Sequence, residues 1–359
     1  MTGESAFCSS YLDAREQFCE VARARGFSVT RYPLARLMGL EGEDLSIDAA
    51  TKGTAGDCLV LLSGVHGVEG FAGSACQIEC MQRVEFDGLR IILIHALNPY
   101  GFSFSSRVNE NRVDLNRNFE DRYPRDYNAR YSDVHATLVE IIAGARVEPP
   151  ARSAIDAWLM YWERKLGREG SFAVITGGQF RHPDGLFYGG HELQPSVRLL
   201  ERILAAHYVP RAARALTIDF HTGLGTPGHG ELIYTGGATD RAWELAQTWL
   251  AEPVTCPQHG NSVSKEVRGS AQSFFVQGHL AREGSYAALE FGTVPIEGMI
   301  AALCEDIWLR TRSDIDPRVA ERVRAGVRAA FRLEQPAWEA AILGRAVQVV
   351  SRAAAALRA

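Results

Sequence analysis

The chain has 359 residues, of which 46% are apolar and 23% are charged, an ordinary globular composition. A net charge of −5, from 38 basic and 43 acidic residues, argues against general nucleic-acid binding, which needs a concentrated basic face. The apolar runs are far shorter than a membrane span, and the N-terminal residues lack the pattern of a secretory signal. We therefore expect neither a nucleic acid nor a membrane as partner.

The seven cysteines are scattered and odd in number, which argues against a disulfide framework. This pattern is typical of a reducing compartment, so we expect a cytoplasmic protein.

In chain order, residues 5–25 predict an opening amphipathic helix. The short apolar runs 58–65 and 90–98 are typical of strands buried on both faces of a parallel sheet, and 71–84 between them predicts a crossover helix. The later expected strands are 172–176, 215–220, 231–234 and 287–291. The expected helices between them are 129–145, 151–168, 194–208, 238–251 and 296–311. This alternation predicts an α/β fold with a mostly parallel sheet.

We expect one domain over residues 1–359, because no linker divides the chain. A helical insertion is expected at about 120–170 and a helical C-terminal extension at about 315–359. Its two helices, 317–333 and 337–358, pack either on the domain or at a subunit contact, so a homo-oligomer remains open. The GLGTPG string at 223–228 matches a dinucleotide-binding pattern, but no helix follows it, and we interpret it as a glycine-rich turn.

His66 and Glu69 follow the first strong strand and lie three residues apart in Gly64–Gly70. Sites in open α/β sheets form beyond the carboxyl ends of strands, and an imidazole with a carboxylate at this spacing suits Zn²⁺. The alternative is a solvated loop pair that arises by chance. His221 ends another strand and supplies a third ligand of a His₂Glu set, the alternative being a core histidine at a strand end.

A third segment, Arg107–Phe119, places arginine, aspartate and asparagine around apolar residues. A loop of this kind is usually solvated, but arginine forks bind carboxylates, so the segment also suits an inward-facing anion site.

These pieces in this order, together with a glutamate in a late strand (Glu290), resemble the zinc carboxypeptidase A-type metallopeptidase family. Its clan includes aspartoacylase and succinylglutamate desuccinylase, and the resemblance over about 58–293 is closest to a bacterial branch of the family. It implies a three-layer α/β fold, a mixed and mostly parallel sheet flanked by helices, and one zinc ion per chain.

The resemblance also implies roles for individual residues. The zinc ligands would be His66, Glu69 and His221, and Asp114 would accept a hydrogen bond from a ligand imidazole. The resemblance makes Glu290 the general base and later acid, with Glu283 and Glu297 as rivals. Arg107 would polarise the scissile carbonyl, with Arg112 as its rival. Substrate carboxylate would bind Asn116 and Arg117. The family's mobile tyrosine has no secure match, Tyr234 and Tyr286 being candidates, and His229 is either a site residue or a turn histidine.

We therefore expect a zinc-dependent hydrolase that uses zinc-bound water and a glutamate base to cleave an amide bond next to a free carboxylate. Its substrate would be a small peptide, as for a metallocarboxypeptidase. The alternatives are an N-acyl-amino-acid deacylase with the same residues and a non-catalytic zinc- or ligand-binding protein.

Overall fold

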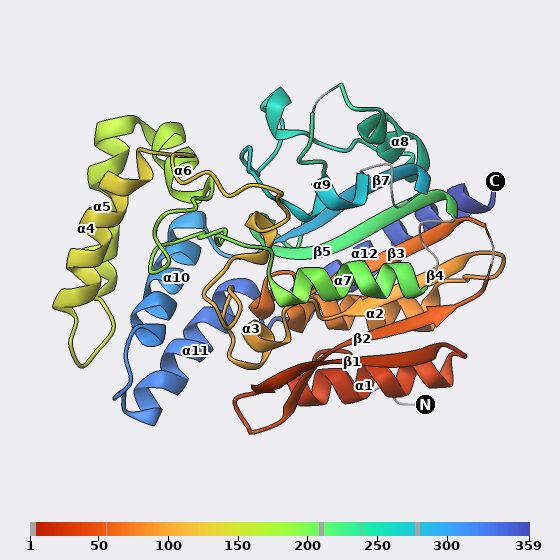
Figure 1. Ribbon diagram of the computed structural model, residues 1–359, viewed down its shortest axis with the longest axis horizontal. Helices are drawn as coiled ribbons and strands as arrows, with labels where there is room; N and C mark the ends of the chain where they lie inside the picture. Colours follow the sequence, from red (N-terminus) through yellow and green to blue (C-terminus); the bar gives the residue numbers. More distant parts are fainter. Residues whose placement is uncertain (1–4, 55, 208–211, 238, 277–280) are drawn as a thin grey trace.

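The computed structural model describes residues 5–54, 56–207, 212–237, 239–276 and 281–359. Within this part of the chain, seven strands form one sheet in the order β1-β2-β4-β3-β5-β7-β6 (Figure 1). The strands are β1 Ser28–Met38, β2 Asp44–Lys52, β3 Cys58–Ser63, β4 Arg90–His95, β5 Ala212–Pro227, β6 Gly230–Ile233 and β7 Ala281–Gly292. The central pairings β4–β3, β3–β5 and β5–β7 are parallel, and the outer ones are antiparallel. The predicted α/β class with a mixed sheet is confirmed.

Helices cover both faces of the sheet, because its central strands are apolar on both sides. The helices on one face are α1 Tyr11–Ala24, α2 Gly70–Arg83, α8 Arg241–Leu250 and α12 Pro336–Arg358. The other face packs against α7 Pro195–Ala206 and α9 Ala271–Val276. The unit β3–α2–β4 is the predicted crossover, with its two strands paired in parallel.

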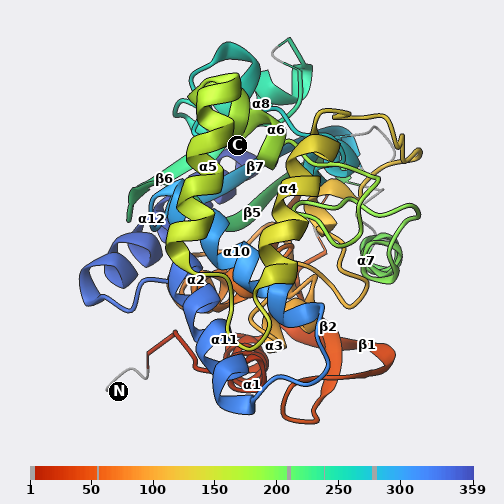
Figure 2. The same cartoon turned by 90° about the vertical axis from the view of Figure 1, so that its left-hand side faces the viewer.

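A helical lobe with its own hydrophobic cluster lies beside the sheet, on the left of Figure 1 and facing the viewer in Figure 2. Its helices are α3 Pro99–Ser103, α4 Tyr131–Gly144, α5 Arg152–Leu166, α6 Arg168–Thr176, α10 Ile296–Arg310 and α11 Pro317–Phe331. The inserted helices α4 and α5 pack on α10, and α10 packs on α11.

The structure corrects three expectations from the sequence. The predicted strand 172–176 is the end of helix α6, because a short apolar run does not distinguish a strand from a buried helix. Strands β1 and β2 were not predicted. Strand β1 is a half-exposed edge strand that contains Pro33, and its pairing with β2 shifts register between Pro33 and Met38. The GLGTPG string continues strand β5 as far as Pro227. The expected helix ends at 208 and 238 lie outside the described residues.

Helix α12 is long and apolar enough to cross a membrane by length and composition alone. In the structure its apolar side packs against α2 and α8. The indole of Trp338 near its start donates a hydrogen bond to the carbonyl of Gly292 at 2.8 Å, which fixes the helix to the end of β7.

Candidate metal centre

His66 and Glu69 come from the turn that joins β3 to α2. Gly64 has a φ of +64°, which lets the chain turn sharply after the strand. His66 then precedes a single 3₁₀ turn, Gly67–Glu69, and Glu69 precedes the first residue of α2. Both side chains are buried, and the Nδ1 atom of His66 lies 2.8 Å from Oε1 of Glu69. The local sequence thus presents an imidazole and a carboxylate to one point.

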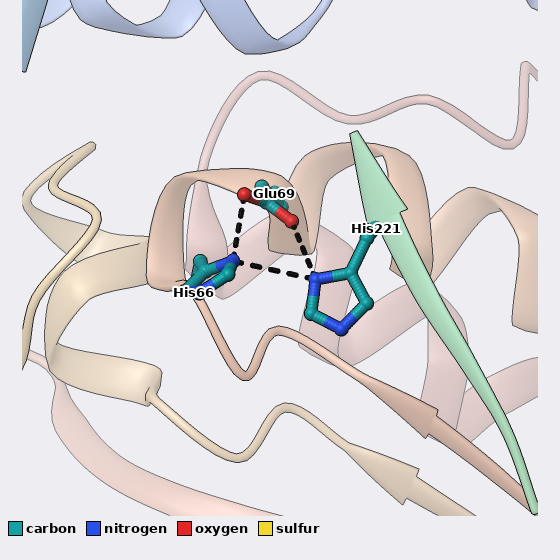
Figure 3. A group of neighbouring side chains, drawn as sticks. All are labelled: His66, Glu69 and His221. Carbon is teal, nitrogen blue, oxygen red and sulfur yellow. Dashed lines mark hydrogen bonds and ion pairs between the residues drawn. The ribbon is translucent and has the colours of Figure 1, made fainter. Parts of the chain in front are cut away.

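His221 reaches the same point from β5 (Figure 3). Its Nδ1 atom lies 3.0 Å from Oε2 of Glu69 and 3.3 Å from Nδ1 of His66. Tetrahedral ligands about 2.0–2.1 Å from a zinc ion lie roughly 3.3 Å from one another. Among the described residues, His66, Glu69 and His221 form the one group of side chains suited in this way to a metal ion. The donor set and its spacing therefore fit a metal ion.

Two buried carboxylates lie behind the imidazoles. Asp219 Oδ2 lies 2.8 Å from Nε2 of His221 and also accepts a hydrogen bond from the Tyr286 hydroxyl at 2.7 Å. Asp114 Oδ1 lies 3.2 Å from Nε2 of His66. A carboxylate that accepts the Nε2–H bond leaves the lone pair of Nδ1 directed at the metal position, which fixes the tautomer a ligand requires.

Arg107 lies against this cluster. Its Nε donates to Asp114 at 2.9 Å, its Nη1 donates to Glu69 at 3.3 Å, and its Nη2 lies 2.7 Å from Nε2 of His66. Burial alone would raise the pKa of Glu69, but the facing imidazoles of His66 and His221 hold it below its ordinary range. Glu69 is therefore ionised, as a metal ligand must be.

Glu290 approaches from β7, where it is the register partner of His221 on β5. Neighbouring residues in register project from the same face of a sheet, so the two side chains lie side by side. Glu290 Oε1 accepts a hydrogen bond from the Leu224 amide at 2.9 Å. Burial, and then the negative charge of Glu69, raise the pKa of Glu290 to about 7. A carboxyl group with such a pKa can exchange protons near neutral pH.

Arg117 and Asn116 line the same pocket as the metal cluster and Glu290. Arg117 is buried, and its two terminal nitrogens each donate at 2.9 Å, to the carbonyls of Asn116 and Thr176. Its Nε atom has no partner among the described residues, and burial lowers the pKa of Arg117 to about 10. The side-chain oxygen of Asn116 accepts from the amide of Ala271 at 2.8 Å, which fixes its orientation.

The structure keeps the rival residues away from the pocket. Arg112 donates to the carbonyl of Arg310 at 3.1 Å, Glu283 pairs with Arg241, and Glu297 pairs with Arg168. The Tyr234 hydroxyl donates to Asp240 at 2.9 Å, and His229 is exposed. Among the described residues that line the pocket there is no tyrosine.

Sequence reasoning missed two features of the site. Asp219 precedes His221 by two positions, and in a strand that spacing places both side chains on one face, so this partner could have been found. Phe187 has no such signal. Its ring lies under the guanidinium groups of Arg107 and Arg117, with centroid distances of 5.0 and 5.6 Å.

The sequence matches the model of a family described as "Protein of unknown function (DUF2817)" over residues 7–345. The chain belongs to the DUF2817 family. No curated protein matches this DUF2817 sequence.

Three solved structures illustrate what this DUF2817 chain is similar to. A metallo-carboxypeptidase from Pseudomonas aeruginosa shares 15% identity over 93% of this chain and 69% of its own, with a TM-score of 0.40. Bovine thrombin-activatable fibrinolysis inhibitor shares 9% identity over 88% and 97%, with a TM-score of 0.42. The succinylglutamate desuccinylase from Chromobacterium violaceum shares 16% identity over 89% and 74%, with a TM-score of 0.38.

Proposed function

We propose that this DUF2817 protein is a zinc-dependent hydrolase that cleaves an amide bond next to a free carboxylate, most simply a metallocarboxypeptidase. One observation carries the proposal: His66, Glu69 and His221 converge on one buried point, while Glu290 lines the same pocket outside the ligand set. A His₂Glu set with a position left for water is typical of catalytic zinc sites.

The residues around this point supply the groups that amide hydrolysis needs. A bound zinc ion would polarise the substrate carbonyl and lower the pKa of a water molecule at the site. Glu290 takes the proton from the attacking water and delivers it to the leaving amine. The pKa of about 7 supports both directions of this transfer. Arg107 stabilises the negative charge that develops on the carbonyl oxygen.

Arg117, assisted by Asn116, holds the terminal carboxylate of the substrate. The support for this role is that Arg117 lines the pocket beside the metal cluster, and that its guanidinium group has more N–H donors than the two used in bonds to carbonyl oxygens. The substrate we propose is a small peptide with a free carboxyl end. The cysteines are scattered along the sequence and odd in number, which supports a cytoplasmic location for the protein.

The test compares two variants. His66→Ala removes a ligand and is expected to abolish stoichiometric zinc in the purified protein, as measured by elemental analysis. Glu290→Gln keeps the ligands, so zinc is expected to stay bound while hydrolysis of blocked dipeptides falls by about 10²–10⁴-fold.

Unchanged activity of Glu290→Gln with zinc bound would refute the role of that residue. The same assay run on N-acyl amino acids distinguishes a carboxypeptidase from a deacylase. Stoichiometric zinc without hydrolysis of either substrate set would identify a non-catalytic binding protein instead.

A further inference from the structure

Lys265 brings a positive charge to the rim of the pocket. It belongs to the segment 263–267, of which Val263, Ser264, Lys265 and Val267 line the pocket. Its ammonium group pairs with Glu169 in the first turn of α6, so the pair joins the 263–267 segment to a helix whose last residue, Thr176, also lines the pocket. The side chain of Lys265 is 36% exposed and that of Glu169 is 82% exposed. Solvent screens such a pair strongly, so an incoming anion can replace Glu169.

The cations that line the pocket differ in how many of their hydrogen-bond donors are already used within the protein. Arg107 already donates hydrogen bonds to Asp114 and Glu69. Arg117 uses two of its five N–H donors in bonds to the carbonyls of Asn116 and Thr176, which leaves donors for one carboxylate. Lys265 has only an exposed, exchangeable partner. The proposed function assigns Arg107 to the reacting carbonyl oxygen, so among the described residues of the lining Arg117 and Lys265 are the cations that remain for carboxylate groups of a ligand.

The rest of the wall near Lys265 is mostly apolar. Ile233 and Ala288 are register partners on β6 and β7, and they line the pocket together with Val263 and Val267. A carboxylate placed against these side chains would lose water without gaining a partner, which is costly. A second acidic group is therefore accommodated only where its methylene stem contacts the apolar wall and its oxygens reach Lys265.

Resting on the proposed function, we propose that Lys265 is a specificity-determining residue that binds a second carboxylate of the substrate. The preferred substrate then carries an acidic residue at its carboxyl end. Arg117 holds the terminal carboxylate, and Lys265 exchanges Glu169 for the side-chain carboxylate. In the absence of substrate, the ion pair with Glu169 holds the ammonium group of Lys265 at the rim of the pocket.

The experiment compares kcat/KM for benzoyl-Gly-Glu and benzoyl-Gly-Gln, which differ in charge but hardly in shape, and for N-acetylglutamate and N-acetylglutamine. The zinc-loaded wild type is expected to prefer the acidic member by about tenfold or more, because a charge-assisted bond is lost in the neutral one. In Lys265→Met the preference falls below about threefold, mainly through KM, and Lys265→Glu reverses it.

Two further variants sharpen the result. Lys165→Met removes the same charge from the outer end of α5, where the side chain lies against Tyr161 and Trp162, and it should leave the preference unchanged. Glu169→Gln removes the competing carboxylate and should lower KM for the acidic substrate. A wild type without preference, or a preference that survives in Lys265→Met, overturns the inference while leaving the hydrolase intact.

If no substrate is hydrolysed, the proposed function fails and calorimetric binding tests the inference separately. N-acetylglutamate should bind the zinc-loaded wild type more tightly than N-acetylglutamine, and Lys265→Met should bind the two equally. Equal binding by the wild type would overturn the inference in that case as well.

Discussion

The side chains of Asp219 and His221 project from the same face of β5. The 2.8 Å contact between Oδ2 of Asp219 and Nε2 of His221 makes Asp219 the residue that orients this candidate ligand. Asp219→Asn keeps the shape but removes the charge that favours the required tautomer. Substitution of a residue that orients a metal ligand typically lowers metal affinity by 10–100-fold, and we expect zinc affinity to fall by about that factor. Competition with a chromophoric chelator measures the change.

A matched pair of tyrosines provides the control. Tyr286 and Tyr234 are both buried, and each donates its hydroxyl to an aspartate, but only the aspartate bonded to Tyr286 contacts a candidate ligand. Tyr286→Phe should weaken zinc binding, whereas Tyr234→Phe should not. Equal effects of the two substitutions on zinc binding would mean that the hydrogen bond from Tyr286 to Asp219 affects the metal site only through the stability of the fold.

Individual residues differ in how far the sequence could predict them. His66 and Glu69 share one turn, so their spacing alone indicated a common target. Glu290 became visible only through the family resemblance, because its position beside His221 depends on the register of β5 against β7. No pattern in the sequence indicated Lys265, because it lies in an irregular segment whose path depends on tertiary contacts.

The turn between β3 and α2 determines where the first two candidate ligands lie. Gly67 packs so closely on helix α3 that a Cβ atom would lie 2.1 Å from the carbonyl carbon of Gly101. Backbone atoms at that distance must move, and the metal-facing turn moves with them. Gly67→Ala is therefore expected to lower both zinc affinity and thermal stability, by about 1–3 kcal/mol for the latter.

Thermal melting of the metal-free protein and zinc titration check this expectation. Gly144→Ala is the matched control, because a Cβ at the end of α4 would meet nothing within 4 Å. That change should be neutral or stabilising by up to about 1 kcal/mol. A Gly67→Ala protein with normal zinc affinity would show that the turn tolerates displacement.

The central strands and the amphipathic helices were predictable from sequence, and the first two strands were not. The apolar runs of β3 and β4 allow little except a central strand, and α2 follows from their parallel pairing. The edge strand β1 alternates irregularly around Pro33. Helix α6 contains β-branched residues and becomes helical through its packing on α5.

The candidate ligands Glu69 and His221 are 152 residues apart in the sequence, so a bound metal ion would join distant parts of the chain. Ligands that bind only the folded state raise its stability by mass action. With free zinc at about 100 times its Kd, the expected gain is about 2.7 kcal/mol, which is a rise of several degrees in Tm.

Scanning calorimetry with and without a chelator measures this shift. Glu290→Gln retains all three ligands and should show the full effect, while His66→Ala should show little or none. A His66→Ala protein that zinc still stabilises as much as the wild type would place the metal elsewhere.

The wall opposite the sheet is supplied by Thr176, Phe187 and the 263–267 segment, and none of these belongs to the strands that carry His221 and Glu290. The residues proposed for catalysis and the residues of this wall, which would select the substrate, thus lie in different segments of the chain. Exchanging the 263–267 segment should change which substrates the pocket admits while His66, Glu69, His221 and Glu290 stay in place. The architecture therefore allows the substrate range to diversify through these peripheral segments without a change in the metal site.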